Sequence, residues 1–146
     1  MSEENVELVR GLQPTDVDLV ELFRTEAAAA ALAAGNVGAM SPDAEIEFVA
    51  AEPGLANLQL RGVEGLVEGW RDWLEGWDSY VLQLEDLLDA GDQVVALVRI
   101  KGRTTRDGVE VEHSPAAVWA IEDGTVVGLT FYLVREQALA AAGLSN

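Results

Sequence analysis

The chain has 146 residues, 49% of them apolar, which suffices for the core of one domain. Its net charge of −17 repels nucleic-acid phosphates and anionic membrane surfaces. With no cysteine, the sequence excludes disulfides and thiolate chemistry, and charges interrupt every apolar run before it reaches the length of a membrane span. We therefore expect one cytoplasmic domain, residues 1–146, that binds neither nucleic acid nor membrane.

The first fifty residues predict two helices and a strand. Residues 3–10 form a short helix, and a longer one opens with Thr15 as its cap and continues through the alanine run to about Ala34. Residues 44–50 then alternate, with Ile46 and Phe48 on one face and acids on the other. This alternation is typical of a half-buried strand.

An amphipathic helix is predicted from Val63 to Trp77, after a loop over residues 52–60 that ends in a short strand. Its apolar stripe comprises Val63, Leu66, Trp70, Trp73 and Trp77. Glycines at 65, 69 and 76 weaken the helix locally, so we expect packing against the rest of the domain to hold it.

The last part of the chain predicts a meander of four long antiparallel strands, starting near residues 80, 93, 109 and 125. Evenly spaced turn signals separate them at Gly91-Asp92, Asp107-Gly108 and Asp123-Gly124. Strands of this length must twist and bend, and Pro115 and Gly102 are the expected bending points. A curled sheet covered by earlier helices predicts an α+β cone with an internal pocket.

Three segments carry a resemblance to a known family. They are the opening Ser2-Glu3-Glu4-Asn5-Val6-Glu7-Leu8-Val9-Arg10, the turn Leu88-Asp89-Ala90-Gly91-Asp92-Gln93-Val94-Val95 and the strand Val118-Trp119-Ala120-Ile121-Glu122-Asp123-Gly124-Thr125-Val126-Val127. With the ending Arg135–Leu144 and the order of elements, they resemble uncharacterised bacterial members of the SnoaL-like branch of the nuclear-transport-factor-like superfamily. The resemblance spans nearly the whole chain, and it is specific for fold but not for function.

That resemblance implies N-terminal helices packed on a strongly curved, mixed or antiparallel sheet that forms a cystatin-like cone. It also implies one pocket per subunit and a homodimer formed through the outer face of the sheet. By the family's register, odd-numbered positions of the second and third meander strands face the pocket. The expected pocket residues are then Phe48, Trp70, Trp73, Leu97, Arg99, His113, Ala117, Trp119 and Phe131.

The known chemistries of the superfamily match this sequence poorly. Ala117 stands where cyclases and ketosteroid isomerases keep an aspartate, and Phe48 takes the place of the isomerase base. Epoxide hydrolases of this fold use an Asp-Arg-Asp set, of which only Arg99 is present. Lys101 and Phe131 replace its two acids.

Two residues remain as weak catalytic candidates. His113 is the only histidine; it is a structural strand residue, a polar group of the pocket, or a general base oriented by Glu45, Glu47 or Asp86. One histidine is too few for a metal site. Arg99 lies in an apolar strand, so it either pairs with an acid or anchors a ligand oxygen.

Two hypotheses about function follow. The first is a pocket for a small apolar or aromatic metabolite, with or without cofactor-free isomerase, cyclase or hydrolase activity. The second is a non-catalytic dimeric module whose cone is filled by its own aromatic side chains, which are as typical of a core as of a binding site. The volume of the cavity discriminates between them.

Overall fold

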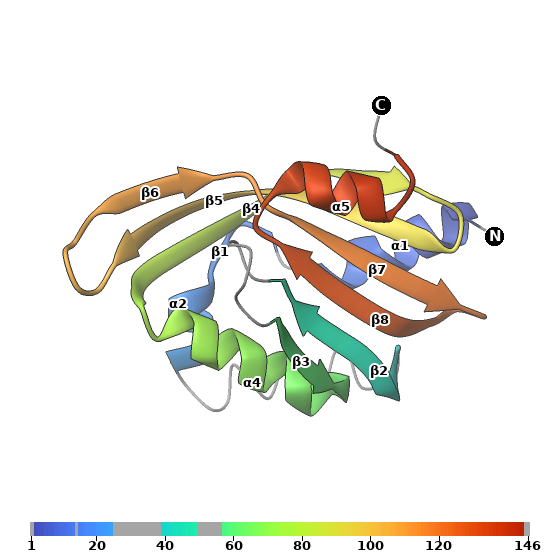
Figure 1. Cartoon of the computed structure of the whole chain (residues 1–146), viewed down its shortest axis with the longest axis horizontal. Coiled ribbons are helices and arrows are strands. Elements are labelled where there is room, and N and C mark those ends of the chain that lie inside the picture. Colours follow the sequence, from blue (N-terminus) through green and yellow to red (C-terminus); the bar gives the residue numbers. More distant parts are fainter. Residues whose placement is uncertain (1, 14, 25–38, 50–56, 145–146) are drawn as a thin grey trace.

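A computed structural model describes residues 2–13, 15–24, 39–49 and 57–144 of the chain. Its helices are α1 (Ser2–Leu12), α2 (Leu19–Arg24), α4 (Gly62–Leu74) and α5 (Arg135–Ala141). Its strands are β1 (Val17–Asp18), β2 (Met40–Phe48), β3 (Leu58–Arg61), β4 (Trp77–Asp89), β5 (Gln93–Thr104), β6 (Glu110–His113), β7 (Ala116–Glu122) and β8 (Thr125–Tyr132). Figure 1 shows them in space.

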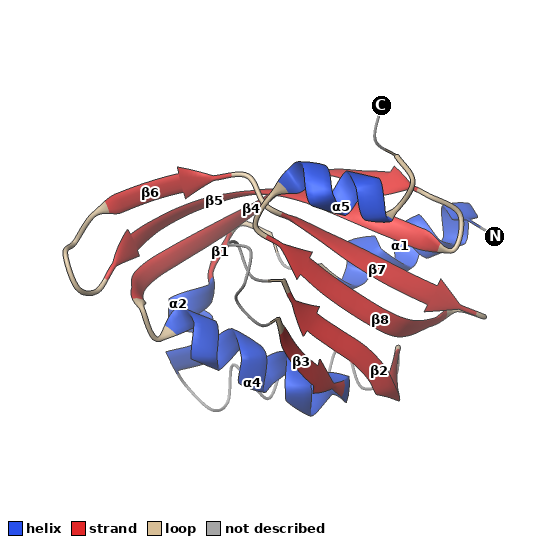
Figure 2. Ribbon diagram, viewed as in Figure 1, coloured by secondary structure: helices blue, strands red, loops and turns tan. Residues whose placement is uncertain are grey.

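The strands form one eight-stranded sheet in the order β1-β4-β5-β7-β8-β2-β3, with β6 paired to the outer part of β5. All pairs are antiparallel except β2 and β8, which run parallel. The sheet bends along β4 and β5, with α2 and α4 on its concave side and α5 on the opposite face (Figures 1 and 2). The α+β class with a curved mixed sheet is confirmed.

The predicted meander is present as β4, β5, the pair β6 and β7, and β8. Its turns fall at the glycines that the sequence singled out. Gly91, Gly108 and Gly124 have φ angles of 84°, 63° and 75°, in the left-handed region that glycine adopts without strain. The turn chemistry therefore explains why the strand order was readable from the sequence.

The third long strand is interrupted at Pro115, one of the two expected bending points, and its register does not slip there. Leu97 pairs with Ala116 in β7, and Ile100 pairs with His113 in β6. The same antiparallel register therefore holds on both sides of the proline, and β6 continues the line of β7.

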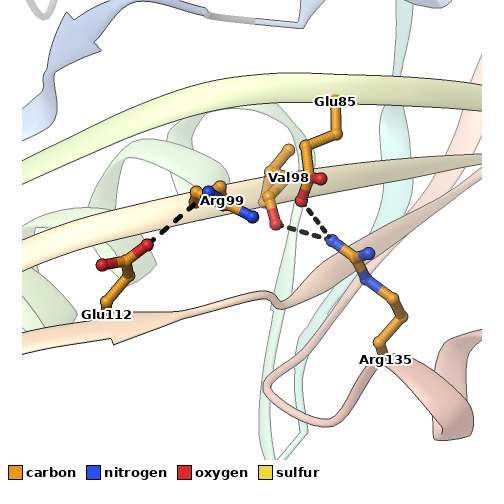
Figure 3. Close-up of polar contacts among 5 residues, drawn as sticks. All are labelled: Glu85, Val98, Arg99, Glu112 and Arg135. Atoms are coloured by element: carbon orange, nitrogen blue, oxygen red, sulfur yellow. Dashed lines mark hydrogen bonds and ion pairs between the residues drawn. The ribbon is translucent and has the colours of Figure 1, made fainter.

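A side chain from α5 repairs the hydrogen bonding at this interruption. The Val98 amide donates to the Pro115 carbonyl at 3.2 Å, but proline has no N–H with which to return the bond. Arg135 Nη2 donates instead to the Val98 carbonyl at 2.9 Å, and also to Glu85 Oε1 at 2.8 Å (Figure 3). A buried carbonyl is costly to leave unpaired, so this arginine stabilises the break.

Gly102 pairs with Tyr80 of β4, and no shift of register falls at this pair. The irregularities in the pairing of β4 with β5 lie between Trp77 and Ser79 and between Leu84 and Asp86. A Cβ atom on Gly102 would clash with the Trp77 ring. The glycine is therefore needed because an aromatic ring packs against its backbone.

The second helix begins later than predicted, at Leu19. Thr15 does not cap it, because its hydroxyl accepts a hydrogen bond from the Leu84 amide of β4 at 2.8 Å. Asp18 takes the capping role, and its Oδ1 accepts from the Val20 amide at 3.0 Å. The predicted continuation through the alanine run lies outside the described residues.

The tryptophan-rich helix α4 ends at Leu74, and Trp77 begins β4 instead of closing the helical stripe. Its glycines allow close approach to the sheet. A Cβ atom on Gly69 would overlap the Phe48 ring of β2. As expected, tertiary packing holds a helix that glycine weakens.

The two faces of the sheet have separate apolar clusters. The inner cluster joins α1, α4 and the inward residues of β2, β5, β7 and β8. The outer cluster joins Val95, Ala116 and Val118 to Ala138 of α5. This helix, which the sequence analysis did not predict, thus covers part of the face through which a homodimer is expected.

Candidate functional site

The inner face of the sheet and helices α2 and α4 enclose a cavity of about 100 Å³. Its lining residues come from both ends of the chain. They are Leu12, Gln13, Leu19, Phe23, Phe48, Val49, Leu66, Trp70, Trp73, Tyr80, Leu82, Val98, Ile100, Pro115, Ala116, Ala117, Trp119, Leu129, Phe131, Tyr132 and Leu133. Six of the nine expected pocket residues are among them: Phe48, Trp70, Trp73, Ala117, Trp119 and Phe131.

The expectation that odd-numbered positions of β5 face the cavity is wrong. Directly paired residues share a face, and β5 pairs Val94 with Trp119 and Ala96 with Ala117. Odd positions of β7 therefore lie beside even positions of β5. Val98 and Ile100 line the cavity in place of the expected residues.

Arg99 and Leu97 consequently lie on the outer face. The Arg99 side chain is 52% exposed, and its Nη1 lies 3.7 Å from Glu112 Oε1 (Figure 3). Leu97 packs in the outer cluster near α5. Of the two readings of Arg99, pairing with an acid is the one observed.

His113 faces inward opposite Ile100, but it lies behind the lining residues. Its ring centroid is 6.2 Å from that of Tyr80, and burial lowers its pKa below the ordinary value of 6.5. Its Nε2 is buried and has no hydrogen-bond partner among the described residues. An uncharged histidine packed edge-on against a phenol ring is the result.

The carboxylates expected to orient His113 do not reach it. Glu47 accepts hydrogen bonds from Asn57 and Gln59, Asp86 accepts one from the Leu87 amide, and Glu45 is exposed. The expected base and orienting acid are therefore not assembled within the described part of the chain.

No charged side chain occurs among the described lining residues. The polar atoms there come from Gln13, the two lining tyrosines and the tryptophan indoles. The Trp119 indole donates to Gln13 Oε1 at 3.3 Å across the end of α1. A chain with 26 acids and 9 basic residues thus presents an uncharged lining to this cavity.

Tyr80 is the most deeply buried of the polar lining residues, with 2% of its surface exposed. Burial raises the pKa of its phenol to about 12, and a hydrogen bond with Trp73 opposes that shift only in part. Its backbone is fixed by Asp18, whose Oδ1 accepts from the Tyr80 amide at 3.1 Å. The phenol is therefore neutral and held in place.

Aromatic rings form one continuous side of the cavity. Phe48 and Phe131 stack with centroids 4.6 Å apart, and Trp70 meets both edge-on, at 5.8 and 5.1 Å. Tyr80 extends the series, with its centroid 6.1 Å from that of Trp70. Such edge and stacked geometries favour flat, apolar contacts.

The nine expected pocket residues did not include Tyr80, Gln13 or the inward residues of β5. The sequence offers Tyr80 and Tyr132 as phenols that could polarise a carbonyl, but it does not distinguish them from structural tyrosines. For β5 a signal was available, because its even positions are all apolar at 94, 96, 98 and 100, whereas Arg99, Lys101 and Arg103 are odd. This alternation predicts the even positions as the buried face. No comparable signal identifies Tyr80, since its burial depends on three tryptophans and on Asp18.

Residues 19–129 match the family described as the SnoaL-like domain. The chain belongs to this family. No curated protein matches the sequence.

Solved structures of SnoaL-like and related proteins share the fold. An NTF2-like protein from Burkholderia thailandensis E264 has a TM-score of 0.65 at 24% identity, with 94% of this chain and 95% of that chain covered. An NTF2-like protein of unknown function from Burkholderia pseudomallei K96243 has a TM-score of 0.65 at 16% identity, with the same coverage. TerC, co-crystallised with polyporic acid, has a TM-score of 0.64 at 18% identity, with 97% of both chains covered.

At these identities the likeness concerns the fold, and the SnoaL-like site must be judged on its own residues. Ala117, at the position where relatives are expected to keep an aspartate, is buried in the lining. Arg99 and Lys101 point away from the cavity, while Phe131 contributes a ring to it. The epoxide-hydrolase set is therefore not assembled in this SnoaL-like cavity.

The described ranges contain no group of three or more histidine, aspartate and glutamate residues that could hold a metal ion. They also contain no helix long and apolar enough to cross a membrane.

Proposed function

We propose that this SnoaL-like protein binds an uncharged, flat and largely apolar small molecule in its inner cavity. The observation that carries the proposal is the lining, which has aromatic rings along one side and no charged side chain among the described residues. Pockets of this kind bind through apolar contact, with a few polar atoms to orient the ligand.

The neutrality of the lining selects against charged ligands. A carboxylate or ammonium group loses its hydration on entering an apolar cavity, and no opposite charge from the described residues compensates that loss. The net charge of −17 would attract cations to the surface but supplies no partner inside. The ligand is therefore neutral at physiological pH.

Binding is supported better than acid–base catalysis. A general base must lie within hydrogen-bond reach of its proton and titrate near the working pH. The described lining offers Tyr80, whose pKa of about 12 keeps it protonated, and Ala117 and Phe131 where relatives are expected to have acids. His113 packs against the Tyr80 ring and is not among the described lining residues.

The volume of the cavity limits the size of the ligand, and it is small enough to be consistent also with the second hypothesis, a module whose cone is filled by its own side chains. A cavity of about 100 Å³ is smaller than the roughly 150 Å³ engineered cavity that accepts benzene. A single-ring ligand thus requires slight displacement of the rings at Phe48 or Trp70. If those rings are fixed, the alternative follows, in which the cone is filled and the domain serves assembly.

A structural neighbour supports a role in binding small organic molecules, because TerC was co-crystallised with polyporic acid. The inference for the present chain is limited to the class of ligand and rests mainly on its own lining. An aromatic side of the cavity and an uncharged interior both favour a neutral ring compound.

The test is the dissociation constant of toluene, measured by NMR titration of the indole N–H signals. Ala117→Leu fills the cavity, so we expect it to weaken binding at least tenfold. Ala140→Leu makes the same change on an exposed position of α5 and should leave binding unchanged. Absence of binding to the wild-type chain, or equal binding by both variants, would favour the filled module.

A further inference from the structure

The inner cavity extends to one end of the sheet, where three strands stop together. Strands β2 and β8 run parallel and end there, and the antiparallel β7 begins there. Val49, Leu133 and Pro115 lie directly beyond these strand ends, and all three line the cavity. We call these three residues the strand-end rim. Since the sheet continues past them as β4, β5 and β6, the rim is a margin of the sheet that borders the cavity.

The cavity is closed differently beside α1 and at the strand-end rim. Beside α1, the Trp119 indole donates a hydrogen bond to Gln13 Oε1 at 3.3 Å. At the rim, the apolar side chains of Val49 and Leu133 line the cavity and are also partly exposed. An apolar molecule passes such side chains through apolar contact alone, whereas passage beside α1 breaks a hydrogen bond. The rim is therefore the easier route into the cavity.

Arg135 holds the strand-end rim from the outer side of the sheet. Two residues, the first of them Leu133, join β8 to α5, which begins at Arg135. Arg135 Nη2 donates to the Val98 carbonyl at 2.9 Å and to Glu85 Oε1 at 2.8 Å (Figure 3). Val98 also lines the cavity, and its amide donates to the Pro115 carbonyl at 3.2 Å. One arginine thus connects the start of α5 to both sides of the rim.

We propose that small molecules enter and leave the inner cavity at the strand-end rim, and that Arg135 is the latch of this passage. In the closed state, α5 holds Leu133 against the cavity. When Arg135 releases Val98 and Glu85, the first turn of α5 moves away from the sheet and the rim widens. This inference rests on the proposed function and adds the control of exchange at the same cavity. Arg135 acts as a positioning residue and does not contact the ligand.

Helix α5 is suited to such a local displacement. It has seven residues, Arg135–Ala141, which are too few to form a stable helix without packing. No side-chain hydrogen bond caps its N-terminus, whereas Ala138 and Leu139 pack in the outer cluster. The later part of the helix can therefore stay docked while its first turn opens. Ala116 belongs both to this cluster and to the cavity lining, so movement of α5 reaches the cavity directly.

A rarely populated open state changes the rates of exchange and not the affinity. The closed form holds the ligand, so the open fraction multiplies the rates of entry and exit by the same factor and cancels from the dissociation constant. Loss of the two Arg135 hydrogen bonds should raise the open fraction about fivefold or more. This pattern distinguishes a latch from a residue that only stabilises the bound form.

The test is the exchange of toluene, followed through the NMR line shapes of the indole N–H signals. We expect Arg135→Met to raise both the association and the dissociation rate about fivefold or more, with the dissociation constant within about twofold of the wild-type value. Arg99→Met removes the neighbouring exposed ion pair and should leave both rates unchanged. Unchanged rates in Arg135→Met, or faster dissociation with correspondingly weaker binding, would overturn the latch.

Two larger side chains test the route itself. Leu133→Phe adds bulk at the strand-end rim, and we expect it to slow both association and dissociation of toluene. Leu12→Phe makes the same change in the lining beside α1 and should not slow them. If Leu12→Phe slows exchange and Leu133→Phe does not, the passage lies beside α1 and the proposed route is wrong.

The outcomes separate this inference from the function on which it rests. If toluene binds the wild-type chain and Ala117→Leu weakens that binding, but Arg135→Met leaves the rates unchanged, the latch is wrong and the cavity proposal stands. If toluene does not bind the wild-type chain, the proposed function fails and the latch fails with it.

Discussion

The two faces of β5 divide the chemistry of this protein. The inward residues Val94, Ala96, Val98 and Ile100 are all buried and apolar. The outward side carries Arg99, Lys101 and Arg103. Two of these side chains form ion pairs with β6: Arg103 lies 3.2 Å from Glu110, and Arg99 lies 3.7 Å from Glu112. The charged residues of β5 thus form ion pairs on the outer surface, whereas its inward residues contribute only apolar side chains to the inner face.

Introducing a charge on the inner face should have the largest effect. Ala117→Asp places a carboxylate in a position that is only 4% exposed, with no cation in the described lining. We expect the free energy of unfolding to fall by roughly 3 to 5 kcal/mol at pH 7. Ala140→Asp, on the exposed side of α5, should change it by less than about 0.5 kcal/mol.

Urea unfolding at pH 7 and pH 5 measures both variants. Burial raises the pKa of the new carboxyl, so part of the lost stability of Ala117→Asp should return at the lower pH. Equal stability of the two variants at pH 7 would mean that the inner face tolerates a buried charge, which would contradict the expected difference between the two faces of the sheet.

Two arginines of the outer face test whether charge or hydrogen bonding matters there. Arg135→Met leaves the buried Val98 carbonyl without its donor at the Pro115 interruption, and we expect a loss of about 1 to 3 kcal/mol. Arg99→Met removes only an exposed pair and should cost about 0 to 1 kcal/mol.

Chemical denaturation gives both values, and amide hydrogen exchange at Val98 gives a local one. Exchange at that amide should accelerate in Arg135→Met and not in Arg99→Met. If the two variants lose the same stability, the hydrogen bond from Arg135 to the Val98 carbonyl does not contribute significantly to the free energy of unfolding.

Gly69 tests the shape of the inner face. Gly69→Ala pushes a methyl group into the Phe48 ring, and we expect a loss of roughly 1 to 3 kcal/mol and weaker toluene binding. Gly76 has open space around its position, so Gly76→Ala should leave stability unchanged or slightly raised. Thermal unfolding and the toluene titration measure both effects. If Phe48 can move freely, Gly69→Ala and Gly76→Ala should have the same stability and the same affinity for toluene.

The smallest effect concerns His113. Its folded pKa lies below the 6.5 of an unfolded chain because burial disfavours the protonated form. Between these values the unfolded chain binds the proton and the folded chain does not, so stability should rise with pH up to about 6.5. Unfolding measured from pH 5.5 to 7.5 should show this slope in the wild-type chain and less of it in His113→Gln. The opposite slope would mean that His113 has a carboxylate partner.

The sequence was sufficient to predict the meander because its turns depend on local residues. Gly91, Gly108 and Gly124 adopt positive φ angles, and Pro115 lacks an N–H, so each position acts through its own backbone. The positions of the turns, and with them the lengths of the strands, therefore depend on local residues and could be read without knowledge of distant contacts.

The faces of the strands were harder to predict, because they depend on which residues pair across the turns. Placing odd positions of β5 beside odd positions of β7 put Arg99 in the cavity, whereas the observed pairing puts Val98 and Ile100 there. The apolar alternation within β5 contained the correct answer. The burial of Tyr80 was not readable from the sequence, since it depends on packing against Trp73 and Trp77 and on the hydrogen bond from its amide to Asp18.

The most direct test of the uncharged inner cavity is competition between toluene and benzylammonium, followed by NMR on the wild-type chain. The two molecules share a ring, and the net charge of −17 favours the cation at the surface. We predict that toluene shifts the indole N–H signals of the lining tryptophans and that excess benzylammonium does not displace it. Displacement of toluene by benzylammonium would contradict the account.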